Sequence, residues 1–144
     1  MKGKVLLVCL FFAAVLLWPQ SSAMEHLSYI GMTLTEVIEN LGVPRTVAIA
    51  RGEEIWQDDV VFQYSTVELY IYRDRVWQIK PVSSHGISSR DSKMVVLLTL
   101  GDTAQDFDDY VLMPITGGNW PLMLRVNFND AGQVTAIYIY RPDF

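Results

Sequence analysis

Clear helix signals lie at residues 31–44, which read GMTLTEVIENLGVP. Thr33 can cap a helix, and Glu36 three residues later can complete a capping box by bonding back to the cap. Gly42 suits the left-handed conformation that ends a helix, and Pro44 prevents the helix from continuing. These signals predict a helix of about eight residues between Thr33 and Gly42.

This helix has one apolar face. Its large apolar residues fall at positions i, i+3, i+4 and i+7, and they are Leu34, Val37, Ile38 and Leu41. A helix of this kind buries its apolar stripe against another element. The segments that follow are rich in β-branched and aromatic residues, and they predict strands at residues 47–50, 54–56, 60–64, 67–72 and 76–80.

The last two of these strands form a predicted hairpin. If residues 73–75 make a three-residue turn, Ile71 pairs with Trp77, Leu69 with Ile79, and Glu68 with Lys80. One face of the hairpin then carries Val67, Leu69, Ile71, Trp77 and Ile79. The other carries Glu68, Tyr70, Tyr72, Val76, Gln78 and Lys80. This alternation suits an antiparallel sheet that helices cover on one side only.

A similar series of signals follows from residue 86. Ser88 is the expected N-cap of a second helix, with Asp91 in the favourable third position, followed by residues 94–100 and by Gly101 as the stop. Strands are expected at residues 110–113, 122–128 and 134–140, and the turn sequence at residues 129–132 joins the last two. A four-residue loop there places Tyr138 and Tyr140 on the open face of the sheet, whereas a five-residue loop turns them toward the core.

Corresponding features recur at a nearly constant offset. The two helix-stop glycines, Gly42 and Gly101, are 59 positions apart, and Ile79 and Ile137 are 58 apart. This spacing predicts an α+β fold of two tandem helix-plus-antiparallel-sheet repeats, with the helices packed on one face of the sheet. The first repeat spans residues 24–82 and the second residues 83–144, in one compact body.

The first of these repeats resembles a known family. Residues 31–44, followed by Trp56 and by an alternating hairpin that ends in Ile79, look like the SmpA/OmlA (BamE-like) domain of small outer-membrane lipoproteins in the β-barrel assembly machinery. Two such units in one exported chain also resemble the β-lactamase inhibitory proteins (BLIP-like), whose tandem repeats present a concave, aromatic-bearing sheet to an enzyme. The resemblance implies an inhibitor-like, non-enzymatic protein-binding module, or alternatively a protein that assembles or maintains the cell envelope.

Residues 1–23 read as a secretory signal peptide, with a charged start, an apolar stretch and small residues before the cleavage site. Cleavage predicts a periplasmic or secreted protein of about 121 residues that does not span a membrane. Lipidation at Cys9 is not expected, because Val8 is not the small residue that should precede a lipidated cysteine. The mature chain would then contain no cysteine, which excludes disulfides, thiol nucleophiles and Cys-ligated metals.

The charge of the chain argues against nucleic acid as a partner. The whole sequence has a net charge of −5, and loss of the two leader lysines makes it −7. Nucleic acids and anionic membranes both require concentrated Lys and Arg. The expected partner is therefore a protein in the cell envelope or outside the cell.

Residue clusters that could carry chemistry are few. An acidic stretch with Asp102, Asp106, Asp108 and Asp109 is a weak candidate for Ca²⁺ binding, but its spacing is not that of an EF-hand, and a solvated acidic loop is favoured. Ser84 and His85 lie in an expected linker, and no nucleophile-elbow motif accompanies them. The sequence therefore predicts no catalytic residue, no metal and no cofactor.

The aromatic residues are the most informative candidates for partner binding. Tyr and Trp combine a large contact area with a polar group and are enriched at interfaces, although tyrosines also pack well within strands. The predicted partner-binding residues are Tyr70, Tyr72, Tyr138 and Tyr140, with Glu68, Lys80 and Arg125 as charged accessories and Trp120 as a loop anchor. Trp56, Phe62 and Trp77 are expected in the core.

Overall fold

The structure, a computed structural model, describes residues 26–54 and 58–144. The predicted signal peptide at residues 1–23, Cys9 within it, and Trp56 lie outside the described residues.

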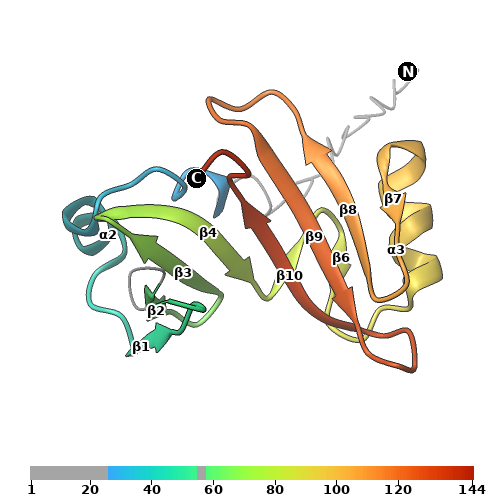
Figure 1. Cartoon of the computed structure of the whole chain (residues 1–144), viewed down its shortest axis with the longest axis horizontal. Helices are drawn as coiled ribbons and strands as arrows, with labels where there is room; N and C mark the ends of the chain where they lie inside the picture. Colours follow the sequence, from blue (N-terminus) through green and yellow to red (C-terminus); the bar gives the residue numbers. More distant parts are fainter. Residues whose placement is uncertain (1–25, 55–57) are drawn as a thin grey trace, which may run out of the picture.

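Eight antiparallel strands form one sheet in the order β1-β2-β3-β4-β10-β9-β8-β7 (Figure 1). The strands are β1 (Thr46–Ala50), β2 (Asp59–Gln63), β3 (Val67–Tyr72), β4 (Arg75–Pro81), β7 (Gln105–Asp106), β8 (Tyr110–Ile115), β9 (Leu122–Phe128) and β10 (Val134–Tyr140). A separate small ladder joins β5 (Ser83–Ser84) to β6 (Ile87–Ser88). The helices are α2 (Leu34–Leu41), α3 (Lys93–Leu100) and the 3-10 helix η2 (Gly101–Thr103).

This architecture corrects the predicted fold. β4 and β10 pair directly, with Ile79 opposite Ile139 and Gln78 opposite Tyr140, so the two runs of strands merge into one continuous sheet. The protein is therefore one large antiparallel sheet with two short helices, and the prediction of tandem helix-plus-sheet repeats is wrong. The resemblance to the SmpA/OmlA and BLIP-like proteins is wrong as well, because it was based on these repeats. Caps and turns specify single elements, but they do not decide which distant strands pair.

Helix α2 begins as its sequence predicts. The Oγ1 atom of Thr33 accepts a hydrogen bond from the Glu36 backbone N–H at 3.2 Å, and the Glu36 carboxylate accepts one from the Thr33 backbone N–H at 2.7 Å. This is the expected capping box. The apolar face is buried only in part, since Val37 is fully enclosed while Leu34 and Ile38 remain 39% and 37% exposed.

Helix α3 begins later than predicted. Its N-cap is Ser92, whose Oγ atom accepts from the Val95 backbone N–H, and not Ser88. The predicted cap is instead held in a turn, because the Asp91 carboxylate accepts hydrogen bonds from both the backbone N–H and the hydroxyl of Ser88. The Asp91 carbonyl also accepts from the Val134 N–H at 2.9 Å, which ties this segment to the start of β10.

The first hairpin has a tighter turn than predicted. Arg73 and Asp74 alone form it, with φ angles of 46° and 64°. The pairs Glu68–Lys80 and Leu69–Ile79 are confirmed, but Ile71 pairs with Val76 instead of Trp77, and a β-bulge absorbs the extra residue. Val76 is consequently buried in the core, and Trp77 moves to the opposite face of the sheet.

The second hairpin combines features of both predicted registers. Its loop has five residues, closed by a hydrogen bond from the Asn129 N–H to the Gln133 carbonyl at 3.0 Å. A bulge between Val134 and Ala136 adds one more residue on β10 and restores the alternation. Tyr138 and Tyr140 therefore lie on the open face, paired with Arg125 and Met123 on β9.

One hydrophobic core lies on the other face, between the sheet and the two helices. It includes Val37 from α2, Val96 from α3, Leu69 and Ile79 from the first run of strands, and Leu124 from the second. Phe62 is buried there as predicted. Within residues 26–54 and 58–144, no helix is long and apolar enough to cross a membrane.

Candidate functional site

The sheet face opposite the core, called the open face below, is hollowed along β4, β10 and β9. The hollow has a volume of about 450 Å³ and is lined by Trp77, Gln78, Arg125, Asn127, Tyr138 and Tyr140. These side chains are half-buried, in alternation with the fully buried residues of the core face. We call this site the aromatic hollow.

Tyr138 makes an aromatic contact at one side of the aromatic hollow. Its ring meets that of Tyr70 edge to face, with centroids 6.4 Å apart. The Tyr70 hydroxyl donates a hydrogen bond to Glu68 at 3.3 Å. Burial, and after it the negative charge of Glu68, raises the pKa of the Tyr70 hydroxyl. Tyr70 therefore remains protonated and keeps donating this bond at neutral pH.

Trp77 is held on both sides at the other end of the aromatic hollow. Its Nε1–H donates to the Asp59 carboxylate at 3.1 Å, and its ring stacks on Phe144 with centroids 6.3 Å apart and planes 5° apart. Phe144 also meets the ring of Tyr72 edge to face at 6.0 Å. Tyr72 thus packs against Phe144 and does not line the hollow.

Arg125 is fixed in place on β9. Its Nε–H donates to the Asn127 side-chain oxygen at 2.8 Å, and its guanidinium carbon lies 3.9 Å from the centroid of the Tyr110 ring. Tyr110 in turn stacks on Phe107 at 4.5 Å. The guanidinium plane is therefore oriented by two neighbours from the protein itself.

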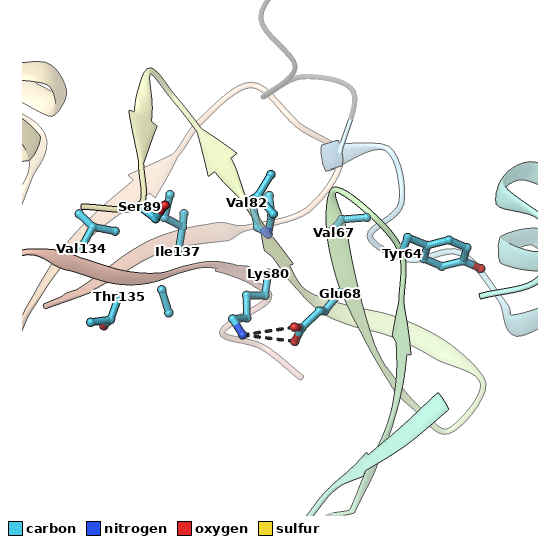
Figure 2. A pocket seen from close by; sticks show the side chains of 11 residues that line it. Tyr64, Val67, Glu68, Lys80, Val82, Ser89, Val134, Thr135 and Ile137 are labelled. Carbon is cyan, nitrogen blue, oxygen red and sulfur yellow. Dashed lines mark hydrogen bonds and ion pairs between the residues drawn. The ribbon is translucent and has the colours of Figure 1, made fainter. Parts of the chain in front are cut away.

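Glu68 and Lys80 lie apart from the aromatic hollow. They form an ion pair at 3.3 Å and line a smaller pocket of about 220 Å³, together with Val134, Thr135 and Ile137 (Figure 2). Both side chains are partly exposed, so this pair is weak and lies at the edge of the open face.

The smaller pocket exists because β4 and β10 separate there. The Arg141 N–H donates to the Trp77 carbonyl, and ladder bonds between antiparallel strands recur at every second residue. The pairing of β4 with β10 ends at Ile79, and the next hydrogen-bonding position on β4 is Pro81. Proline has no N–H to donate, and the strands diverge from this point.

Trp120 lies in the loop between β8 and β9, away from the aromatic hollow. The guanidinium carbon of Arg141 is 3.9 Å from the centroid of its ring. A Cβ atom at Gly31 would lie 3.0 Å from its Nε1 atom, which is a tight contact, and the φ of 92° at this position favours glycine. Trp120 is 41% exposed and borders a separate hollow beside Leu27 and His85.

The polar clusters noted in the sequence have ordinary contacts. Asp106 pairs with Lys93 at 2.6 Å, and Asp102, Asp108 and Asp109 are exposed. In the part of the chain that the structure describes, no group of three His, Cys, Asp or Glu side chains could hold a metal ion. Ser84 Oγ lies 2.8 Å from His85 Nδ1, and burial lowers the pKa of that imidazole.

The structure therefore brings together only part of the predicted site. Arg125, Tyr138 and Tyr140 line the aromatic hollow, and Tyr70 supports it. Trp77 and Asn127 were not predicted for this site. The two-residue turn at Arg73–Asp74 shifts the register by one residue relative to the predicted three-residue turn, and this shift places Trp77 on the open face.

Comparison with family profiles and with curated proteins finds no match. Among solved structures, the chain is similar to an extracellular protein containing a SCP domain from Bacillus anthracis strain Ames, with a TM-score of 0.51 and 10% sequence identity. The match covers 99% of this chain and 50% of that one, so the chain spans about half the length of this neighbour. At this identity the likeness shows the fold alone.

Proposed function

We propose that this chain is an exported, non-enzymatic module that binds a protein partner through its open face. The observation that carries the proposal is the aromatic hollow, where Trp77, Tyr138, Tyr140 and Arg125 gather on three adjacent strands. Trp, Tyr and Arg are the residue types that contribute most to binding energy at protein interfaces.

Contacts within the protein hold these side chains in place, and this also suits binding. Tyr138 contacts Tyr70, Trp77 is fixed by Asp59 and Phe144, and Arg125 is fixed by its own neighbours. Side chains that are already ordered lose little conformational entropy when a partner covers them. The part of each ring that is still exposed can therefore be buried by a partner at little entropic cost.

Export is supported by two independent observations. The leader pattern of residues 1–23 is that of a cleaved signal peptide, which would deliver the chain to the periplasm or the medium. The structural neighbour is an extracellular protein. The alternative role in envelope assembly depended on the family resemblance that the fold contradicts, and no contact in the described residues favours it.

The proposal is tested by measuring the affinity of the purified chain for a partner recovered by crosslinking in native envelope or culture medium. We expect Tyr138→Ala to weaken binding at least about tenfold, because it removes a ring carried by β10, the middle one of the three strands that line the hollow. Leu98→Ala is the control, since Leu98 is exposed on α3, a helix that packs against the core on the other side of the sheet. Equal dissociation constants for wild type and Tyr138→Ala, with both proteins folded, would contradict the proposal.

A further inference from the structure

Arg125 differs from the other residues of the aromatic hollow in its charge. Among the described residues that line the hollow, it is the only one that is charged; the others are aromatic or carry amides. The chain as a whole is acidic, with 16 Asp and Glu against 11 Lys and Arg. A basic side chain in this protein therefore has many potential intramolecular partners.

Arg125 nevertheless has no carboxylate partner in the described part of the chain. Each ion pair there involves another basic residue, and these are Arg51, Lys80, Lys93 and Arg141. Among residues 26–54 and 58–144, the one side-chain hydrogen bond of Arg125 uses its Nε–H and ends on the neutral amide of Asn127. Its two Nη groups carry four N–H donors, which are available to bind a group on a partner.

The fixed orientation of Arg125 limits which chemical groups its Nη atoms can bind. The stacking on Tyr110 and the bond to Asn127 hold the guanidinium plane, so its Nη atoms form a rigid fork. Such a fork matches the two oxygens of a carboxylate in a bidentate pair. The rings of Trp77, Tyr138 and Tyr140 around the hollow suit an apolar or aromatic side chain next to that carboxylate.

We propose that the aromatic hollow binds an acidic segment of the protein partner, in which an Asp or Glu side chain pairs with Arg125 and an adjacent aromatic side chain enters the hollow. This inference rests on the proposed function, because it names the chemistry of the partner at the same face. Charge complementarity sets the register, since a basic segment meets repulsion at Arg125 and an acidic one is attracted there.

The test uses two blocked dipeptides as probes, N-acetyl-glutamyl-phenylalaninamide and its glutaminyl isostere, which differ only in the carboxylate. Binding to the folded chain is followed by ¹H–¹⁵N NMR through the Nε–H signals of Arg125 and Trp77. We expect the glutamyl probe to bind with a dissociation constant of about 1–10 mM and at least about fivefold more tightly than the glutaminyl probe.

Variants of Arg125 test whether the preference for the glutamyl probe comes from the guanidinium group of this residue. Arg125→Gln should bind both probes alike, and Arg125→Lys, which keeps the charge but lacks the fork, should retain only part of the difference. Arg45→Gln is the matched control, because Arg45 is an exposed arginine just before β1 and does not line the hollow; it should behave as wild type. The backbone NMR spectrum reports whether each variant is folded.

Two results would overturn the inference. If both probes shift the hollow signals of the wild type equally, the face recognises the ring without the carboxylate, and the proposed function survives alone. If neither probe shifts those signals, the inference fails, and the proposed function is then judged only by the effect of Tyr138→Ala on the affinity for the protein partner.

Discussion

Asp59 links the open face to the pH dependence of stability. Its carboxylate accepts the Trp77 hydrogen bond, and burial raises its pKa above the usual 3.8. A raised pKa means that the folded state holds the proton more tightly than the unfolded state, so the free energy of unfolding falls as the pH rises from about 3.8 through the folded pKa. Asp59→Asn removes the charge and keeps an acceptor oxygen for Trp77.

We therefore expect Asp59→Asn to gain stability relative to wild type as the pH rises from about 3 to 7. The gain should stay below about 1 kcal/mol, because solvent screens this partly exposed group. Urea denaturation across this pH range measures it. Asp130→Asn, in the exposed turn before β10, corrects for the general effect of removing a negative charge. A stability difference that does not change with pH would contradict the assignment.

Trp77 shows why single residues of the site were hard to predict. Its size and apolar character favour the core, and a three-residue turn would have placed it there. The actual turn uses Arg73 and Asp74 in left-handed conformations, which favour Asn and Gly over Arg. The residue types therefore do not predict this turn. The two-residue turn shifts the register by one residue, and this exchanges Val76 and Trp77 between the two faces of the sheet.

At the scale of elements, the cap of α2 yields a direct prediction. Thr33→Ala removes the acceptor of the Glu36 N–H and one side of the capping box, so the free energy of unfolding should fall by about 1 kcal/mol at neutral pH. Thr33→Ser keeps the hydroxyl and serves as the control. Chemical denaturation measures both, and equal stability of the Ala and Ser variants would show that the cap contributes nothing.

The same cap predicts a pH effect of known sign. Hydrogen bonds from Thr33 lower the pKa of Glu36 below 4.5. A lowered pKa stabilises the folded state above the unfolded pKa, and this contribution is lost as the pH falls through the folded value. Thr33→Ala keeps the backbone N–H that contributes most to this shift and loses only the bond from the hydroxyl, so the difference between wild type and Thr33→Ala should shrink in part as the pH falls below 4.5. The cap of α3 was predicted wrongly, because hydrogen bonds to distant residues of β10 fix the segment before Ser92.

At the scale of the molecule, the strands were predicted closely but their assembly was not. Residues 67–72, 122–128 and 134–140 are strands with the predicted bounds, because alternation and turn residues are local signals. The joint between β4 and β10 brings together residues that are about 60 positions apart, and nothing local specifies it. The aromatic hollow spans this joint, so most of the site could not be assembled from sequence alone.

The pairing of β4 with β10 also predicts how the whole molecule unfolds. Ile79 is fully buried between Leu69 on β3 and Ile139 on β10, in a core that includes residues of both runs of strands. Ile79→Ala should lower the free energy of unfolding by about 2–5 kcal/mol and Ile79→Val by about 0.5–1.5 kcal/mol. Because one core is shared, tryptophan fluorescence and far-UV circular dichroism should give the same urea midpoint in wild type and in both variants. Midpoints that separate in Ile79→Ala would show instead that β1–β4 and β7–β10 unfold independently, and that their common ladder contributes little to cooperativity.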